Sequence, residues 1–282
     1  MRQISKVNQT MVGTLYLVIA ASIWGGMYVV SKMVLVFVSP LLLLWLRYIV
    51  ALVTLVVLVF ATQPSWRVRA GDLWLIAGVG ITGYAVSVWA QFVGTALSTA
   101  QMGAVITSAT PAFMVVFARI MRRERMTRRK TLAVAVATIG VLFIVGVSKM
   151  GHGNPWGVVA LAIAAITWAF MSVLVTGIAR ESSQLVVTLY AIAVATLAIT
   201  PLCFAQLHEV PAVLSHPLLV GGVLYLGVVS TALAFFLWTK GLQIVGATWL
   251  SLRDVQKGDL HGTGTSLSGL RSGRFSRDEE NG

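Results

Sequence analysis

The chain has 282 residues, of which 57% are hydrophobic and only 11% are charged. About a quarter of the residues in a soluble domain are charged, so this composition excludes one or two soluble domains of ordinary size. A secreted scaffold held by disulfides is excluded as well, because Cys203 is the single cysteine. The net charge of +12 could indicate a protein that binds nucleic acid. The positions of the basic residues along the chain instead favour a role in orienting the protein in a membrane.

Eight stretches are apolar and long enough to cross a hydrocarbon core about 30 Å thick, which takes roughly 20 residues of helix. In chain order they are about 13–31, 40–60, 73–93, 97–118, 131–147, 157–177, 185–205 and 217–238. None of them alternates with period two, so the pattern predicts helices and not barrel strands. Arg47, in the second stretch, is the one charge well inside a span.

The basic residues of the connections favour one side of the predicted membrane. Thirteen share the side of the N-terminus: Arg2, Lys6, Arg67, Arg69, Arg119, Arg122, Arg123, Arg125, Arg128, Arg129, Lys130, Arg180 and Lys240. Only Lys32 and Lys149 fall on the other side. The positive-inside rule then places the N-terminus in the cytoplasm. Nucleic acid or anionic lipid could bind the run from 119 to 130, but topology explains it more simply, and we expect no nucleic-acid partner.

An offset of 144 residues superimposes two parts of the chain. It places Ile19, Ala20, Ala21, Trp24, Met27 and Val29 on Ile163, Ala164, Ala165, Trp168, Met171 and Val173. It also places Leu75, Gly78, Val79, Gly83, Ala90, Phe92 and Thr95 on Leu219, Gly222, Val223, Gly227, Ala234, Phe236 and Thr239. Five spans precede the second copy, and an odd number makes the repeat inverted, with a substrate cavity at mid-membrane between the copies.

The residues resemble a known family. Ile-Trp-Gly-Gly at 23–26, Leu-Arg-Tyr at 46–48 and Ala-Leu-Ser-Thr-Ala at 96–100 are similar to EamA-type members of the drug/metabolite transporter superfamily. The resemblance covers residues 1 to about 252. It implies ten helices in two five-helix repeats, both termini in the cytoplasm, and export of small metabolites, amino-acid-like solutes or drugs across a bacterial inner membrane. No cofactor is implied.

The chain departs from this pattern near its end. Residues 244–252 are apolar but reach only about 13 Å as a helix, and residues 253–282 carry ten charges and six glycines. We therefore expect an all-α membrane protein, a helical bundle of two inverted repeats with eight full spans and a partial ninth. The repeats occupy 1–150 and 151–252, and 253–282 form a disordered tail. An altered reading frame, a fusion or a truncated family member would each explain the break, and transport would be impaired.

Eight residues are candidates for binding substrate within the spans: Trp24, Tyr28, Arg47, Tyr48, Tyr84, Trp89, Gln91 and Trp168. Burying Arg47 costs about 2.5 to 3.5 kcal/mol on insertion scales, so it should face the bundle and contact an anion or carboxylate. Snorkelling or bonding to a neighbouring helix's carbonyls is the alternative. Trp24 and Trp168 lie too deep for interfacial anchoring. The aromatic residues would line a pocket for amphipathic solutes, although packing between helices is the more common role for any one of them. Gln91 could contact substrate or form a hydrogen bond to another helix.

Three residues of the fourth span are candidates for gating. Pro111 frees a backbone carbonyl, and the hydroxyls of Ser108 and Thr110 can bond to such a group. A kink that moves during transport and a static bend both fit this pattern.

Competing functions remain open from the sequence alone. A membrane-embedded enzyme would need an acid/base pair or metal ligands at membrane depth, but all four histidines fall in connections or the tail, and no metal or phosphate-binding motif occurs. We therefore expect no enzyme, metal or cofactor. The other alternative is a non-transporting remnant, or a subunit that completes its cavity with a second chain, as a homodimer would. The expected partners are a small-molecule substrate and the lipid bilayer.

Overall fold

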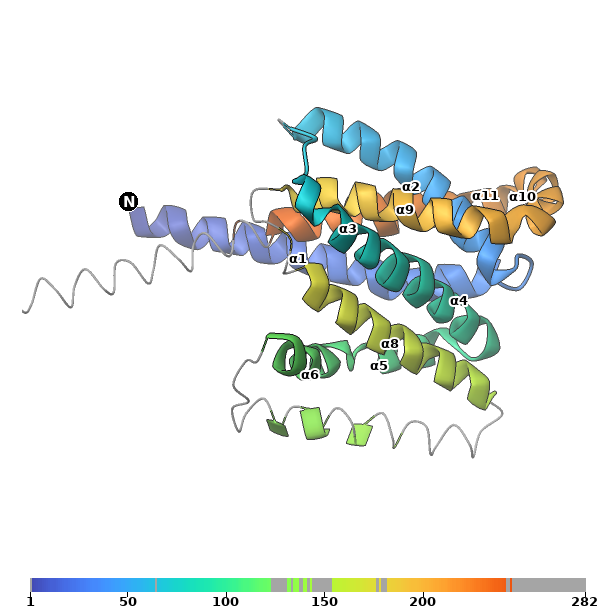
Figure 1. The fold of residues 1–282 in the computed structure, drawn as a ribbon, viewed down its shortest axis with the longest axis horizontal. Coiled ribbons are helices and arrows are strands. Elements are labelled where there is room, and N and C mark those ends of the chain that lie inside the picture. Colours follow the sequence, from blue (N-terminus) through green and yellow to red (C-terminus); the bar gives the residue numbers. More distant parts are fainter. Residues whose placement is uncertain are drawn as a thin grey trace, which may run out of the picture. The chain divides into compact units, whose positions relative to one another are not determined.

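The computed structural model describes residues 2–63, 65–122, 131–132, 134–136, 139–140, 143, 154–175, 178, 182–241 and 244, with the backbone alone for 2–9 and 122. Helices dominate these ranges, and none of the described residues lies in a strand (Figure 1). The chain divides into two compact units. The larger unit is Ile19–Phe236, and the smaller combines Met1–Val18 with Leu237–Gly282.

Seven helical segments in the described ranges are long and apolar enough to cross a membrane. They are Thr10–Val34, Pro40–Thr62, Ala70–Leu97, Ala100–Met121, Pro155–Val175, Gln184–Ser215 and Pro217–Gly241. Each coincides with one of the eight expected spans. Most of the remaining span, 131–147, lies outside the described residues, and so do the tail and all of the partial ninth helix except Ile244. The chain is thus a helical, multi-pass membrane protein.

The second of the first two helices starts where the sequence supplies a signal. Helix α1 spans Arg2–Val34, and α2 spans Pro40–Thr62. Ser39 caps α2, because its hydroxyl oxygen accepts a hydrogen bond from the backbone N–H of Leu42 at 3.3 Å. Pro40 occupies the first helical position, where a missing N–H costs nothing. The loop between the helices is therefore short and fixed.

The third and seventh spans are not uniform α-helices. The third runs as η1 (Ala70–Asp72), α3 (Leu73–Val79), a π-helix η2 (Gly80–Ser87) and α4 (Val88–Leu97). The seventh begins as α11 (Pro217–Leu224), passes through a second π-helix, η4 (Tyr225–Leu233), and continues as helix to Gly241. π-Helices are rare and often mark functional sites, so both segments are of interest.

The remaining helices complete the larger unit. They are α5 (Ala100–Thr107), α6 (Thr110–Arg122), α8 (Pro155–Val175), α9 (Gln184–Cys203), η3 (Phe204–Glu209) and α10 (Val210–Ser215). Thr99 caps α5 through a bond from the N–H of Met102, and Asn154 accepts one from the N–H of Trp156 at the start of α8. The expected span 185–205 differs here, because helical structure continues through Glu209 to Ser215, and Glu209 is not in an open connection.

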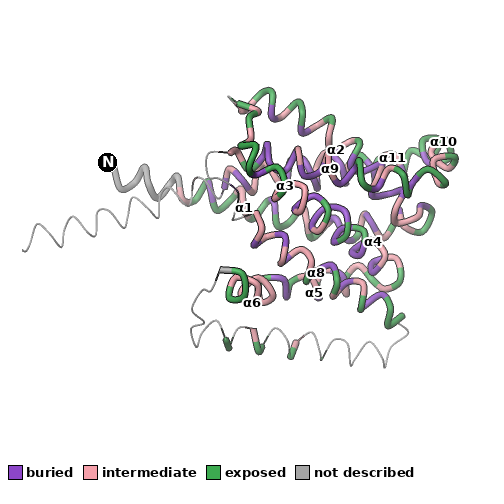
Figure 2. Tube along the Cα trace, in the orientation of Figure 1, coloured by how far each residue is buried: buried purple, intermediate pink, exposed green. Residues whose placement is uncertain are grey.

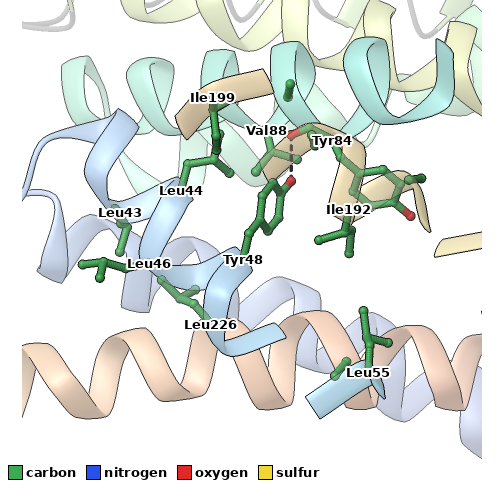
Figure 3. Close-up of a cluster of buried hydrophobic side chains, with 14 of the residues drawn as sticks. Leu43, Leu44, Leu46, Tyr48, Leu55, Tyr84, Val88, Ile192, Ile199 and Leu226 are labelled. Carbon is green, nitrogen blue, oxygen red and sulfur yellow. Dashed lines mark hydrogen bonds between the residues drawn. The ribbon is translucent and has the colours of Figure 1, made fainter. Parts of the chain in front are cut away.

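Buried and exposed residues alternate along these helices with the helical period (Figure 2). The buried core of the larger unit includes Tyr48, Phe92, Leu44, Leu226 and Ile192, part of which Figure 3 shows. The outer faces carry large apolar side chains; Phe60 on α2 is 80% exposed and Leu197 on α9 is 73% exposed. Apolar surface of this extent is what a bilayer would cover.

Glycines set the closest helix contacts in the larger unit. A Cβ on Gly94 of α4 would come within 2.8 Å of the carbonyl oxygen of Gly157 on α8. A Cβ on Gly227 of η4 would lie 2.6 Å from Val50 and 2.9 Å from the carbonyl oxygen of Arg47, both on α2. Small residues allow helix backbones to approach closely in membranes. In the smaller unit, Gly241 fits likewise against Leu17 and the carbonyl of Gly13.

Candidate functional site

The guanidinium of Arg47 lies inside the helix bundle of the larger unit. Its side chain is 4% exposed. Nε donates a hydrogen bond of 2.7 Å to Oγ1 of Thr231, and Nη2 lies 3.5 Å from Oγ of Ser230. The Arg47 Cζ stands 5.6 Å from the centre of the Phe92 ring. The contacts are thus to hydroxyls of η4 and a ring of α4, which is neither snorkelling nor bonding to carbonyls.

The π-helical segment η4 holds the partner hydroxyl in place. Oγ1 of Thr231 donates to the carbonyl oxygen of Leu226 at 2.7 Å while it accepts from Arg47. Both the donor and an acceptor position of this hydroxyl are therefore used, which fixes its orientation. Arg47 forms no ion pair with any described residue, and within the described ranges its charge meets hydroxyl dipoles and the Phe92 ring.

An aromatic cluster lies next to this guanidinium. Phe235 is at its centre, with ring centroids 5.4 Å from Trp24, 5.8 Å from Tyr84 and 6.3 Å from Trp168. Tyr84 also meets Trp168 edge to face at 5.7 Å and Tyr48 at 6.5 Å. Edge-to-face pairs at these separations are favourable beyond the area they bury. Five helical segments contribute to the cluster: α1, α2, η2, α8 and the part of the seventh span that follows η4.

Each π-helix offers a backbone carbonyl to an aromatic donor from another helix. The hydroxyl of Tyr48 donates to the carbonyl oxygen of Tyr84 in η2 at 2.7 Å (Figure 3). The indole Nε1–H of Trp24 donates to the carbonyl oxygen of Ser230 in η4 at 3.1 Å. Ser230 thereby joins the two parts of the site, because its carbonyl meets the aromatic cluster and its hydroxyl faces the Arg47 fork.

Tyr28 connects α1 with the broken fourth span. Its hydroxyl lies 2.6 Å from Oγ1 of Thr107, which in turn donates to the carbonyl oxygen of Gly103 at 2.8 Å. Since the Thr107 hydrogen is used in that bond, Tyr28 is the donor of the shorter one. The Tyr28 ring packs against Gly103, because a Cβ added there would lie only 2.7 Å from a ring carbon of Tyr28.

The break in the fourth span follows the chemistry expected of Pro111. Helix α5 ends at Thr107 and α6 begins at Thr110, with a turn at Ser108 and Ala109. Pro111 has no N–H for the carbonyl of Thr107, and Oγ1 of Thr110 donates to that carbonyl at 2.6 Å instead. Ser108 is exposed and bonds to the carbonyl of Val105. The interruption is compensated locally, as the sequence suggested.

Gln91 and Trp89, the other two candidates, differ in placement. Gln91 is 8% exposed, and its Nε2 has no hydrogen-bond partner among the described residues. Trp89 is 45% exposed and takes no part in the aromatic cluster. The structure therefore brings Trp24, Tyr48, Tyr84 and Trp168 together in one chain of ring contacts, with Arg47 beside it, and leaves Trp89 on the outside of the described bundle.

Several residues of the site were missed in the sequence. Phe235, Ser230, Thr231 and Phe92 are central, yet no motif marks them. The offset of 144 would have pointed to Phe235, because it is the counterpart of Gln91. Lys32 was expected in a connection between spans, but it lies in α1. Its Nζ donates to the carbonyls of Thr95, Ala96 and Ser98 at 2.7–2.9 Å and so caps the C-terminus of α4.

Metal chemistry finds no support in the described ranges. They contain no group of three or more His, Cys, Asp or Glu side chains that could hold a metal ion. Most of the buried polar side chains in these ranges are hydroxyls, and Arg47, Asp72 and Gln91 are the others.

Comparisons with known proteins agree on one class. The model of the EamA-like transporter family matches residues 11–146 and 155–252. An uncharacterized transporter from Archaeoglobus fulgidus is 23% identical over 225 residues, which cover 79% of this chain and 77% of that protein. The uncharacterized transporter YetK of Bacillus subtilis is 24% identical over 253 residues, or 86% and 74% of the two chains. A crystal structure that is 20% identical has a TM-score of 0.56 and covers 89% of this chain and 88% of its own, a likeness of fold alone.

Proposed function

Because this chain belongs to the EamA-like transporter family, we propose that it is a secondary transporter that exports small amphipathic solutes by alternating access. The solutes would be metabolites, amino-acid-like compounds or drugs. We place it in a bacterial inner membrane, with its N-terminus in the cytoplasm, as the charges of its connections favour.

The observation that carries this proposal is the aromatic cluster around Phe235. Trp24 and Trp168, which the offset of 144 makes counterparts, both contact the Phe235 ring, at 5.4 and 6.3 Å. A site formed jointly by equivalent residues of two repeats is the arrangement expected of an inverted-repeat carrier. Aromatic faces with few polar groups suit an amphipathic solute.

The element boundaries lend further support to two related halves. Shifted by 144 residues, α2 (Pro40–Thr62) falls on α9 and η3, and Leu73 falls on Pro217, the first residues of α3 and α11. The π-helices η2 and η4 also correspond, and the packing is reciprocal: α2 packs on η4, and α9 packs on η2. In Figure 1 the Ile19–Val34 part of α1 and α8 run in opposite directions, which favours an inverted relation.

Gating is proposed for the break between α5 and α6. Ser108, Thr110 and Pro111 surround it, and the bond from Thr110 to the Thr107 carbonyl keeps the backbone satisfied without an unbroken helix. The hydroxyl of Thr107 also lies 2.6 Å from the hydroxyl of Tyr28 on α1. A change in the angle between α5 and α6 would therefore move or break a contact with α1, the helix that carries Trp24. Helix interruptions of this kind serve as hinges in transporters.

Counterflow in proteoliposomes tests the proposal. Vesicles containing the full chain would be loaded with one of a panel of unlabelled aromatic amino acids and amphipathic drugs, and uptake of the labelled compound would be followed. We expect accumulation for at least one compound, reduced about tenfold or more in Trp24→Ala and Trp168→Ala, and unchanged in Trp89→Ala. If no compound accumulates above empty vesicles, or if Trp89→Ala alone abolishes accumulation, the proposed function fails.

A second candidate is a subunit whose cavity is completed by another copy of the chain. The abrupt change from the apolar stretch 244–252 to the charged stretch 253–282 favours it. Native mass measurement in detergent would identify a homodimer, and counterflow that requires the dimer fraction would favour this candidate over the monomer.

A further inference from the structure

Besides Oγ of Ser183, just before α9, the larger unit buries three polar atoms that have no hydrogen-bond partner among the described residues. They are Nη1 of Arg47, Nε2 of Gln91 and Oγ1 of Thr95. Their side chains are 4%, 8% and 0% exposed. An unpaired buried donor costs free energy comparable to a lost hydrogen bond, and an unpaired buried charge costs more. Three such atoms together indicate that something else completes them.

Arg47 contacts α4, the helix that carries Gln91 and Thr95. Gln91 and Thr95 are four residues apart on α4 and so share a helix face. Phe92, between them, lies under the guanidinium at 5.6 Å. Thr95 Oγ1 also lies 3.3 Å from the position of a Cβ on Gly103, next to the Tyr28 ring. The three groups therefore lie where α4 meets α2 through Phe92, and where it meets α1 and α5 near Tyr28 and Gly103.

The guanidinium of Arg47 forms a short hydrogen bond on its Nε side and has unpaired N–H groups on its Nη1 side, among the described residues. Its Nε edge is fixed by the 2.7 Å bond to Thr231. Nη2 has only the 3.5 Å contact with Ser230, and both N–H groups of Nη1 are unused. A planar fork with two free parallel donors matches the two oxygens of a carboxylate. The amide of Gln91 and the hydroxyl of Thr95 supply further donors.

We propose that these groups form an anion subsite for the carboxylate of the transported solute, whose apolar or aromatic part lies against Trp24, Tyr84, Trp168 and Phe235. This inference rests on the proposed function, since it names the class of solute for that site. Ser230 connects the two parts, with its hydroxyl toward the fork and its carbonyl bonded to Trp24. The solute is an aromatic or amphipathic monocarboxylate, and its charge supplies the counter-ion that Arg47 does not find among the described residues.

The test uses probes of matched shape, one with a carboxylate and one with a neutral amide in its place. Indole-3-acetate, phenylacetate and benzoate would be compared with their primary amides by the thermal stabilisation of the full chain in detergent, with sodium chloride at equal ionic strength as reference. We expect at least one carboxylate to bind about tenfold or more tightly than its amide, as the strength of charged hydrogen bonds implies. In Arg47→Gln that ratio should fall to about one, and Arg47→Lys should give an intermediate value.

Gln91→Leu separates a binding role from a structural one. Because Nε2 has no partner in the described protein, we expect the variant to unfold at the same temperature as the parent or higher, while its preference for the carboxylate falls severalfold. This variant also keeps the proposal testable if Arg47→Gln does not fold.

Three outcomes would overturn the anion subsite. One is no stabilisation by any of the three carboxylates, and another is equal stabilisation by each carboxylate and its amide. The third is stabilisation no greater than that by sodium chloride. None of these results affects counterflow of a neutral or zwitterionic compound, so the transporter assignment and the anion subsite can fail separately.

Discussion

Hydroxyl side chains inside the spans fall into two groups. Thr54, Thr82, Thr188 and Thr196 each donate to the carbonyl four residues earlier, which satisfies the hydroxyl without linking helices. A second group of polar side chains bonds across helices, as Tyr48 does to Tyr84 and Ser87 does to Ala164. The local bonds could arise in any isolated helix, so it is the second group that specifies how the helices are arranged.

The indole of Trp24 offers a test at this scale. In Trp24→Phe the ring contact with Phe235 is retained, but the carbonyl of Ser230 loses its donor. We expect the free energy of unfolding in detergent to fall by about 1 kcal/mol, the usual net value of one hydrogen bond in a membrane protein. Trp89→Phe is the control, because that side chain is largely exposed, and its unfolding should be unchanged. Equal destabilisation of the two variants would contradict a special role for the bond.

At the scale of elements, two π-helical segments face the opposite half of the larger unit. η2 packs against α9 and α8, and η4 packs against α2. Each segment supplies a carbonyl for an aromatic side chain of another helix and carries a glycine at a close approach, Gly83 or Gly227. The irregular turns therefore take part both in close packing and in hydrogen bonds between helices.

Gly227 gives a clearer test than Gly83, because a Cβ there would meet backbone as well as a side chain. A methyl group there would meet Val50 and the backbone carbonyl of Arg47 on α2, and the backbone cannot turn aside as a side chain can. We expect Gly227→Ala to unfold at a lower temperature, with a loss of about 1 to 3 kcal/mol from overpacking. Gly25→Ala is the matched control, since nothing lies within 4 Å of its Cβ position. A loss of stability in the control equal to that in Gly227→Ala would refute the packing argument.

For the whole molecule, the charges of the connections predict sidedness. Cys203 is the single cysteine, so Cys203→Ala gives a background without thiols. In that background Phe37→Cys and His216→Cys, both at exposed positions, should react with a membrane-impermeant maleimide from the outer face. Ser65→Cys should react only after the membrane is opened, because the Arg67 and Arg69 connection belongs to the cytoplasmic side. Labelling of Ser65→Cys in sealed cells would reverse the predicted topology.

The sequence by itself determined the class of fold and most of the helices. Runs of about 20 uncharged residues have no stable alternative to helix in a bilayer, so seven expected spans coincide with helical segments. Family membership followed from the same patterns and agrees with the match to residues 11–146 and 155–252. Residue chemistry with local consequences was also predictable, as the bond from Thr110 to the Thr107 carbonyl beside Pro111 illustrates.

Only the tertiary structure decided which side chains meet. Trp24, Trp89 and Trp168 are all tryptophans within spans, yet Trp24 and Trp168 join the cluster and Trp89 faces outward, because the face a residue presents depends on how its helix is rotated in the bundle. The π-turns, the partnership of Arg47 with Thr231 and the central place of Phe235 likewise depend on contacts between residues far apart in the chain. Hydropathy sets which stretches of the chain can cross a membrane, whereas packing between helices sets which residues form a site.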